Sequence, residues 1–328
     1  MKLLKLVPDN TNIGFLKWRN IAFAISSLLM IASIFFIVTK GLNYGVDFIG
    51  GQMVRVTFTQ SAEAPVEELR GKISSLGYGD ATIQRFGKEN QVSIRMKLPA
   101  GADEKPELAN EMASKITAKL KTDYKGVVID GVDSVSGKVS SELFSKGLWA
   151  LIAAILGVSA YIWLRFEWQF GVGAIWALVH DVLLTLGLFS VTGMEFDLNT
   201  IAALLTIIGY SLNDTIVVYD RIRENLKKYR KMEMGALLDL SVNETLSRTI
   251  MTSLTILSPL FVLVLFGPGV IFGFSLAMTF GIFVGTYSSV YMAAPILIWL
   301  KVGPDSFIPA EGAGEKTDRN NEGYGAQV

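Results

Sequence analysis

The sequence of 328 residues contains no cysteine and a single histidine, His180. The absence of cysteine excludes disulfides, thiolate catalysis and cysteine-ligated metal sites, and one histidine excludes a multi-histidine metal site within the chain. Charged residues are scarce at 18% of the chain, against about 25% in an average soluble domain. Basic and acidic residues number 30 each, so no excess charge favours nucleic acid as a partner. We expect neither a metal nor a cofactor.

Apolar residues, in contrast, make up 51% of the chain and gather into long runs. A membrane-spanning helix needs roughly 20 predominantly apolar residues, and six segments meet this requirement. They are Ile21–Val38, Leu143–Leu164, Phe170–Thr192, Leu198–Tyr219, Thr249–Phe266 and Ile271–Leu300. The sequence therefore predicts a membrane protein with six transmembrane helices.

Lysine and arginine predict how these helices are oriented, because short cytoplasmic loops carry an excess of both. Seven such residues lie between the fourth and fifth spans, whereas the loops 193–199 and 267–269 contain none. The seven are Arg221, Arg223, Lys227, Lys228, Arg230, Lys231 and Arg248. We therefore expect both termini in the cytoplasm.

This layout divides the chain into four parts. Residues 1–40 hold the cytoplasmic N-terminus and the first span, and residues 143–302 hold the other five spans. Residues 41–142 form a domain on the opposite, outer side of the membrane. The polar, glycine-rich residues 303–328 are expected to be a disordered cytoplasmic tail.

The outer domain shows the alternation of apolar and polar residues that is typical of strands, interrupted by two helical patterns. The order strand–helix–strand–strand–helix–strand predicts a ferredoxin-like α+β fold, with residues 88–90 joining the central hairpin. The segments in chain order are Gln52–Gln60, Val66–Gly77, Ala81–Gly87, Gln91–Leu98, Lys105–Tyr124 and Gly126–Val135. This domain carries no paired carboxylates, nucleophile elbow or phosphate loop, so we do not expect an enzyme.

The heptapeptide GVDFIGG, residues 45–51, links the first span to the first strand. A turn that requires a positive φ at Gly50 or Gly51 explains its glycines. A hinge between membrane and outer domain, formed by Asp47, Gly50 and Gly51, is the other interpretation. The sequence leaves both open.

The fourth span carries a carboxylate within its apolar run: GYSLNDTIVVYDRIREN, residues 209–225, contains Asn213 and Asp214 several residues before the charges at its end. An aspartate at the centre of a membrane helix costs roughly 2.5–3.5 kcal/mol, and such residues usually mark functional sites. Helical spacing places Thr206, Tyr210, Asn213 and Asp214 on one polar stripe, which we expect to face other protein. A proton-carrying role is favoured over a helix–helix hydrogen bond with no role in transport.

Two further polar groups accompany Asp214. Arg248, at the cytoplasmic end of the fifth span, is at a comparable distance from the same membrane face, so the two side chains could meet. Burial favours the neutral carboxyl and a nearby arginine favours the carboxylate, so a proton could switch this pair. Arg248 alone would suit snorkelling to the headgroups. The His180–Asp181 pair lies midway along the third span, where a proton relay and a structural polar network are almost equally good interpretations.

Four motifs together resemble the SecF branch of the SecD/SecF family, membrane proteins of bacterial protein export within the RND superfamily. They are GVDFIGG, the His180–Asp181 pair, GYSLNDTIVVYDRIREN and LSRT around Arg248. The resemblance implies a six-helix half-bundle in the bacterial inner membrane that is completed by SecD. It also implies that the proton-motive force assists translocation of preproteins through SecYEG, with YajC and YidC as further partners. The residues implicated in proton transport fall on Asp214 and Arg248.

Two other functions compete with this one. The first is a half-subunit of an RND-type exporter of small molecules or lipids, which would use the same membrane chemistry. The short outer segment argues against it, because such pumps usually carry much larger outer domains. The second is a purely structural membrane scaffold, in which Asp214 and Arg248 would both tolerate replacement.

Overall fold

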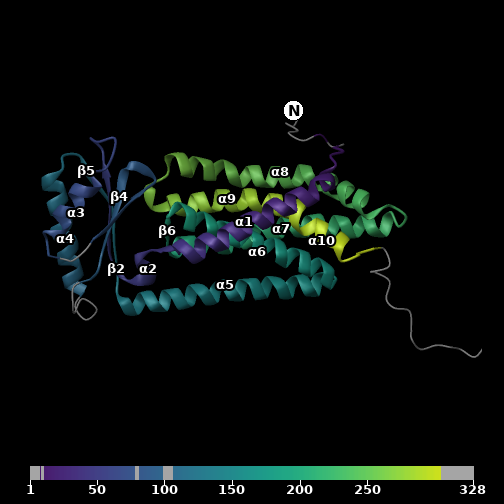
Figure 1. Ribbon diagram of the computed structural model, residues 1–328, viewed down its shortest axis with the longest axis horizontal. Coiled ribbons are helices and arrows are strands. Elements are labelled where there is room, and N and C mark those ends of the chain that lie inside the picture. Colours follow the sequence, from purple (N-terminus) through teal and green to yellow (C-terminus); the bar gives the residue numbers. More distant parts are fainter. Residues whose placement is uncertain (1–7, 9–10, 78–80, 99–105, 304–328) are drawn as a thin grey trace, which may run out of the picture.

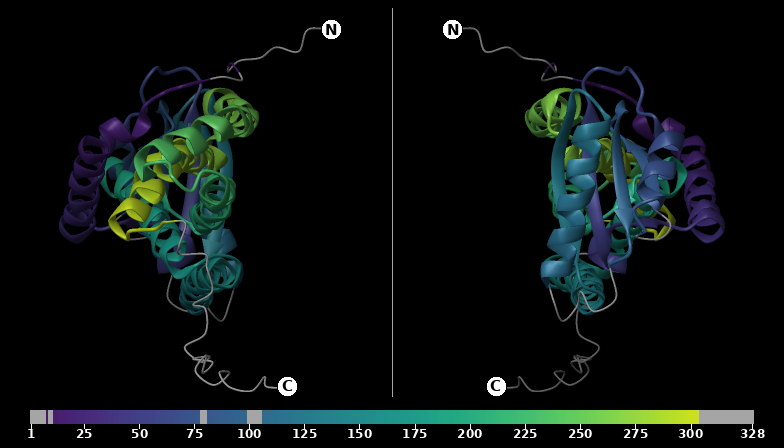
Figure 2. Two further views of the ribbon diagram at one scale, coloured as in Figure 1. Left: turned by 90° about the vertical axis from the view of Figure 1, so that its right-hand side faces the viewer. Right: turned by 90° about the vertical axis from the view of Figure 1, so that its left-hand side faces the viewer.

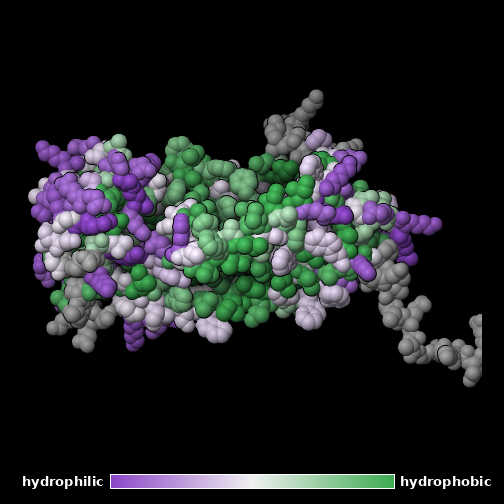
Figure 3. Space-filling view, viewed as in Figure 1, coloured by the Kyte–Doolittle hydropathy of each residue, from purple (hydrophilic) through white to green (hydrophobic). Residues whose placement is uncertain are grey.

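The computed structural model describes residues 8, 11–77, 81–98 and 106–303, so the predicted tail lies outside the described residues except for Gly303. A bundle of long helices occupies one end of the elongated molecule and a small sheet domain occupies the other (Figure 1). On the face shown in Figure 3, apolar residues cover the middle of the bundle and the sheet domain is mostly polar.

Six helices of the described chain are long and apolar enough to cross a membrane, as predicted. The first consists of a 3-10 turn, Phe15–Trp18, and α1, and the last consists of a 3-10 turn, Gly269–Ile271, followed by α9, a π-helical turn and α10. The bounds are α1 Arg19–Lys40, α5 Gly137–Arg165, α6 Trp168–Thr192, α7 Leu198–Lys228, α8 Met234–Phe266, α9 Phe272–Ser288, π turn Ser289–Ala293 and α10 Ala294–Trp299.

The helices α6 and α7 form the centre of the bundle. In each of them 56% of the most apolar stretch is buried, against 11% in α5. The π turn that follows α9 has a local cause. Pro295 stands near the start of α10, and because proline lacks an N–H it cannot bond the carbonyl of Tyr291 one turn earlier.

The fifth span is longer than the sequence predicted. We expected it to begin at Thr249, whereas α8 begins at Met234 and runs for 33 residues. At 1.5 Å per residue it is about 50 Å long, which exceeds the roughly 30 Å of a bilayer core. The polar first turns of α8 therefore continue the membrane helix beyond the apolar run.

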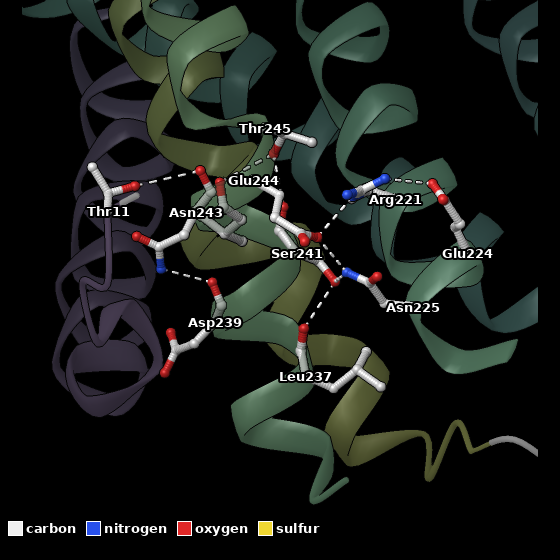
Figure 4. A network of polar contacts seen from close by, with 11 residues as sticks. Thr11, Arg221, Glu224, Asn225, Leu237, Asp239, Ser241, Asn243, Glu244 and Thr245 are labelled. Carbon is white, nitrogen blue, oxygen red and sulfur yellow. Dashed lines mark hydrogen bonds and ion pairs between the residues drawn. The ribbon is translucent and has the colours of Figure 1, made fainter. Parts of the chain in front are cut away.

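A polar network joins these turns of α8 to the end of α7 (Figure 4). Glu244 accepts hydrogen bonds from Arg221 Nε at 2.7 Å and from Asn225 Nδ2 at 2.6 Å, and Asn225 also donates to Ser241 at 2.9 Å. Asn243 binds the backbone of Ile13 through both atoms of its amide group. The network fixes the α7–α8 hairpin and holds the segment before α1 against it.

The sheet domain has the predicted ferredoxin-like order and lies between α1 and α5 in the chain. Its antiparallel strands are ordered β3-β4-β2-β5, and α3 and α4 cover the sheet face that points away from the bundle (Figure 2). The elements are β2 Gly51–Phe58, α3 Val66–Ser74, β3 Thr82–Phe86, β4 Lys88–Met96, α4 Pro106–Asp123 and β5 Val127–Val135.

The position predicted for the hairpin turn was wrong. Residues 88–90 were expected to form it, but Lys88 already pairs with Phe86 and begins β4. The reversal is instead made at Gly87, whose φ of 66° favours glycine.

Two short elements connect the sheet domain to the bundle. The strand β1 (Asn43–Tyr44), directly after α1, pairs in parallel with β6 (Glu195–Phe196), which lies between α6 and α7. The single helical turn α2 (Val46–Ile49) then leads into β2. The open face of the sheet is turned toward these connections and toward the start of α9.

Candidate functional site

The carboxylate of Asp214 lies inside the bundle, where α7 and α8 meet the π turn. The residue is 4% exposed. Thr249 Oγ1 of α8 donates to Asp214 Oδ1 at 2.7 Å, and Ser289 Oγ of the π turn donates to Oδ2 at 3.0 Å. Two neutral hydroxyls, each from a different helix, therefore hold a buried acid.

Arg248 does not pair with Asp214 in the described chain, although the sequence suggested that they could meet. Its side chain is exposed, and it is the adjacent Thr249 that faces the carboxylate. Neighbouring residues on a helix do not point in the same direction, so Thr249 rather than Arg248 forms the direct contact with Asp214. The arginine instead lies on the outer surface of α8.

The polar stripe expected on α7 is divided between two faces. Asp214 is buried, whereas Thr206 and Asn213 are exposed. Tyr210 is half-buried, and its hydroxyl lies 2.8 Å from Ser253 Oγ of α8. The stripe was expected to face protein throughout, but within this chain only part of it does.

The His180–Asp181 pair is completely buried, with both residues 0% exposed. His180 Nδ1 lies 2.8 Å from Asp181 Oδ1, and Asp181 Oδ2 accepts hydrogen bonds from Ser211 and, at 2.8 Å, from Ser288. His180 Nε2 is buried and has no partner among the described atoms, and His180 is one of the residues that line a groove of about 530 Å³ between α1, α6 and α9. This arrangement fits a structural network as well as a relay.

Sequence reasoning missed two serines, each of which donates a hydrogen bond to one of the two buried carboxylates. Ser288 binds Asp181 and Ser289 binds Asp214. Each hydroxyl also lies close to a backbone carbonyl of the preceding turn, Gly285 O at 3.1 Å and Thr286 O at 3.0 Å. The serines thus have a second acceptor available. The signal in the sequence was a Ser-Ser pair shortly before Pro295. A proline within a long apolar run favours a local irregularity of the helix such as a π turn, and π turns often occur at functional sites.

The GVDFIGG motif forms a turn that caps α7. Gly50 and Gly51 have φ values of 70° and 126°, which confirms the turn interpretation, whereas the hinge interpretation stays a prediction. Asp47 Oδ2 accepts a hydrogen bond from Leu198 N at 3.0 Å. This carboxylate satisfies one of the free N–H groups at the start of α7 and complements the helix dipole.

Gly51→Ala is expected to destabilise the sheet domain. A Cβ at this position would lie 2.6 Å from the carbonyl oxygen of Met96, and the positive φ alone costs about 1–3 kcal/mol for a non-glycine residue. Thermal unfolding and limited proteolysis of the purified chain measure the effect. Gly71→Ala is the control, because nothing lies within 4 Å of its Cβ and alanine favours helix α3. Equal stability of the two variants would contradict this account of the motif.

Comparison with known proteins decides the family. Residues 115–303 match the family described as "Protein export membrane protein SecD/SecF, C-terminal", and residues 35–62 match the "SecD/SecF GG Motif". The chain belongs to the SecD/SecF family. Within it, relatives that are 41–45% identical to this chain carry the name "Protein translocase subunit SecF". "Protein translocase subunit SecF" of Cereibacter sphaeroides is 45% identical over 302 residues, which cover 91% of this chain and 93% of the relative.

Further SecF relatives and solved SecDF structures agree with this assignment. SecF of Rhodobacter capsulatus is 44% identical, with 90% of this chain and 91% of the relative covered. The crystal structure of SecDF from a Thermus species matches 89% of this chain with a TM-score of 0.79 and 33% identity. A SecDF structure in a super-membrane-facing form matches 89% with a TM-score of 0.61 and 32% identity. This chain spans only 39% of each SecDF chain.

Proposed function

We propose that this chain is the SecF half of a SecDF complex that uses the proton-motive force to assist translocation of preproteins through SecYEG. The observation that carries the proposal is Asp214, an acid buried between helices long and apolar enough to span a membrane, with only hydroxyl hydrogen-bond partners in the described chain. Intramembrane carboxylates usually mark proton or ion pathways. We propose neither an enzymatic activity nor a cofactor.

The proton changes which groups hold α7 to its neighbours. The ionised Asp214 accepts from Thr249 and Ser289 and draws α8 and the π turn toward α7. Once protonated, the carboxyl is a weaker acceptor, and Ser289 turns to the carbonyl of Thr286. One proton that crosses about 100 mV supplies roughly 2.3 kcal/mol, which can bias such a two-state element but cannot unfold a domain.

The exposed polar face of α7 and α8 supports SecD as the partner. Asn213 and Arg248 are exposed, and within the described chain neither side chain forms a hydrogen bond or an ion pair to Asp214 or to another residue. Polar and charged groups at membrane depth are costly when they face lipid. A second half-bundle packed on this face would cover them and would bring its own polar groups toward Arg248 and Asp214.

We place both termini in the cytoplasm and the sheet domain on the outer side of the bacterial inner membrane. The start of α1 and the end of α10 lie at the bundle end far from the sheet domain (Figure 1). Lys227 and Lys228 lie in the last turn of α7, and Arg230 and Lys231 follow before α8 begins. Such a cluster favours the cytoplasmic side. YajC and YidC remain expected partners on the strength of the family resemblance.

Removal of the chain distinguishes translocation from small-molecule export. In cells that lack it, pulse-chase labelling is expected to show delayed conversion of the precursor of a periplasmic protein, and a plasmid-borne copy restores normal kinetics. Accumulation of a small molecule or lipid with unchanged secretion would instead support an RND-type exporter. Normal precursor conversion together with normal efflux would support a structural scaffold.

A further inference from the structure

Glu195 lies where the chain segments that join the sheet domain to the bundle come together. It belongs to β6, opposite Asn43 of β1, three residues before the start of α7. A Cβ on Gly45 would be 2.7 Å from Glu195 Oε1. The side chain therefore packs directly against the first glycine of the GVDFIGG motif.

A pocket of about 240 Å³ separates the open face of the sheet from the loops of the bundle. Arg55 and Gln84 line it from the sheet, Glu195 and Asp197 from the α6–α7 connection, and Gly269 from the start of the last span. Glu195 Oε1 is buried and has no hydrogen-bond partner among the described atoms. An acidic oxygen without a partner thus lies at the contact between the two parts of the molecule.

The arginines near Glu195 are engaged with other groups. Arg55 is 8% exposed and pairs with Asp133 on β5. Arg95 donates to the carbonyl oxygen of Tyr44. Arg85, which also lines the pocket, pairs with acids of the sheet domain. None of them forms an ion pair with Glu195 in the described chain.

Burial raises the pKa of Glu195 from 4.5 to about 6. The carboxylates of Asp197 and Asp47 raise this pKa further, whereas the charges of Arg55 and Arg95 partly oppose the rise. A carboxyl that binds its proton more tightly in this arrangement than in water stabilises the arrangement when it is protonated. The stabilisation is complete at pH values below the ordinary 4.5 and is lost as the pH rises through about 6.

We infer that Glu195 is a positioning residue. It makes the packing of the sheet domain against the start of α7 depend on the proton concentration on that side of the membrane. When protonated, Glu195 fits the closed pocket as a neutral group. When ionised, it attracts water into the pocket and repels Asp47 and Asp197, so the sheet domain separates more readily from the start of α7. The sensor requires no proton transfer at Asp214.

The two solved SecDF structures bear on this inference. Each matches 89% of this chain, but with TM-scores of 0.79 and 0.61. Solved members of the family therefore include more than one arrangement of the matched region.

The absence of cysteine from the natural chain allows a direct test. Spin labels on Thr122→Cys in α4 and Phe266→Cys at the end of α8, both exposed positions, report the distance between sheet domain and bundle in lipid nanodiscs. Between pH 5 and pH 8, pulsed electron spin resonance is expected to show a shift toward longer distances with a midpoint near pH 6. A pKa that rises from 4.5 to about 6 corresponds to at most about a thirty-fold change in the equilibrium between the packed and the separated sheet domain, of which about eight-fold falls between pH 5 and pH 8.

Matched variants show whether Glu195 causes the change in distance with pH. Glu195→Gln is expected to keep the low-pH distance distribution at every pH, because the amide cannot ionise. Glu142→Gln, which removes an exposed acid at the start of α5, is expected to retain the wild-type response. Asp214→Asn is expected to retain it too, which separates this inference from the proposed function. A wild-type distribution that is unchanged between pH 5 and pH 8, or a Glu195→Gln protein that titrates like the wild type, would overturn the inference.

Discussion

Asp214→Asn is expected to yield a folded, membrane-inserted chain that has lost all of the proton-dependent part of its export activity. Asparagine has the shape of aspartate, and its Oδ1 can still accept the hydrogen bond from Thr249. Ser289 can turn to Thr286 O, which already lies 3.0 Å away. What the amide cannot do is bind and release a proton. Pulse-chase export in cells whose only copy carries the variant measures the loss.

The matched control is Asp220→Asn on the same helix. Asp220 is partly exposed and pairs with Arg165 at 2.7 Å, and an exposed ion pair contributes only about 0–1 kcal/mol. This variant is therefore expected to export normally at equal membrane levels. If Asp214→Asn also exported normally, Asp214 would be a packing residue.

Gly187→Ala is expected to have the largest effect on the stability of the bundle. Gly187 of α6 touches α1 so closely that an added Cβ would lie 2.1 Å from Ser33 Oγ and 3.1 Å from the backbone Cα of Ser33. Small residues at such contacts allow membrane helices to approach. Because backbone must move to make room, we expect a loss of about 1–3 kcal/mol or more. Thermal unfolding of the purified chain in detergent measures it.

Gly157→Ala in α5 tests whether the effect depends on the contact rather than on the loss of a glycine. Nothing lies within 4 Å of a Cβ at Gly157, and alanine is the better helix former. We expect this variant to be as stable as the wild type or slightly more so. A similar loss in both variants would show that the α1–α6 contact does not account for it.

The sequence predicted most of the architecture because the spacing of apolar residues and the length of apolar runs are local properties of the chain. Apolar runs located all six spans, and alternation located the strands of the sheet domain. The failures arose where a helix continued beyond its apolar run, as α8 does from Met234, and where one glycine rather than a polar tripeptide made the turn, as at Gly87.

The candidate site was less predictable because it depends on which side of each helix faces its neighbour. Asp214 was found because burying an aspartate in a membrane helix costs free energy. Its partner was not found, because Arg248 and Thr249 are adjacent in sequence and only the threonine forms a hydrogen bond with the carboxylate. The contacts of Ser288 and Ser289 depend on a π turn, and uncharged serines give no signal in a hydropathy pattern. Glu195 was not singled out in the sequence, because its partial burial arises only when the sheet domain packs against the α6–α7 connection.

The central claim, that Asp214 carries a proton across the membrane, is tested most directly by proton flux. The chain and its SecD partner would be reconstituted into liposomes containing a pH-sensitive dye, with a potassium diffusion potential and a pH gradient imposed together. We predict proton entry with the wild type and none above protein-free liposomes with Asp214→Asn, while Asp220→Asn matches the wild type. Equal proton entry with Asp214→Asn, or none with the wild type, would contradict the claim.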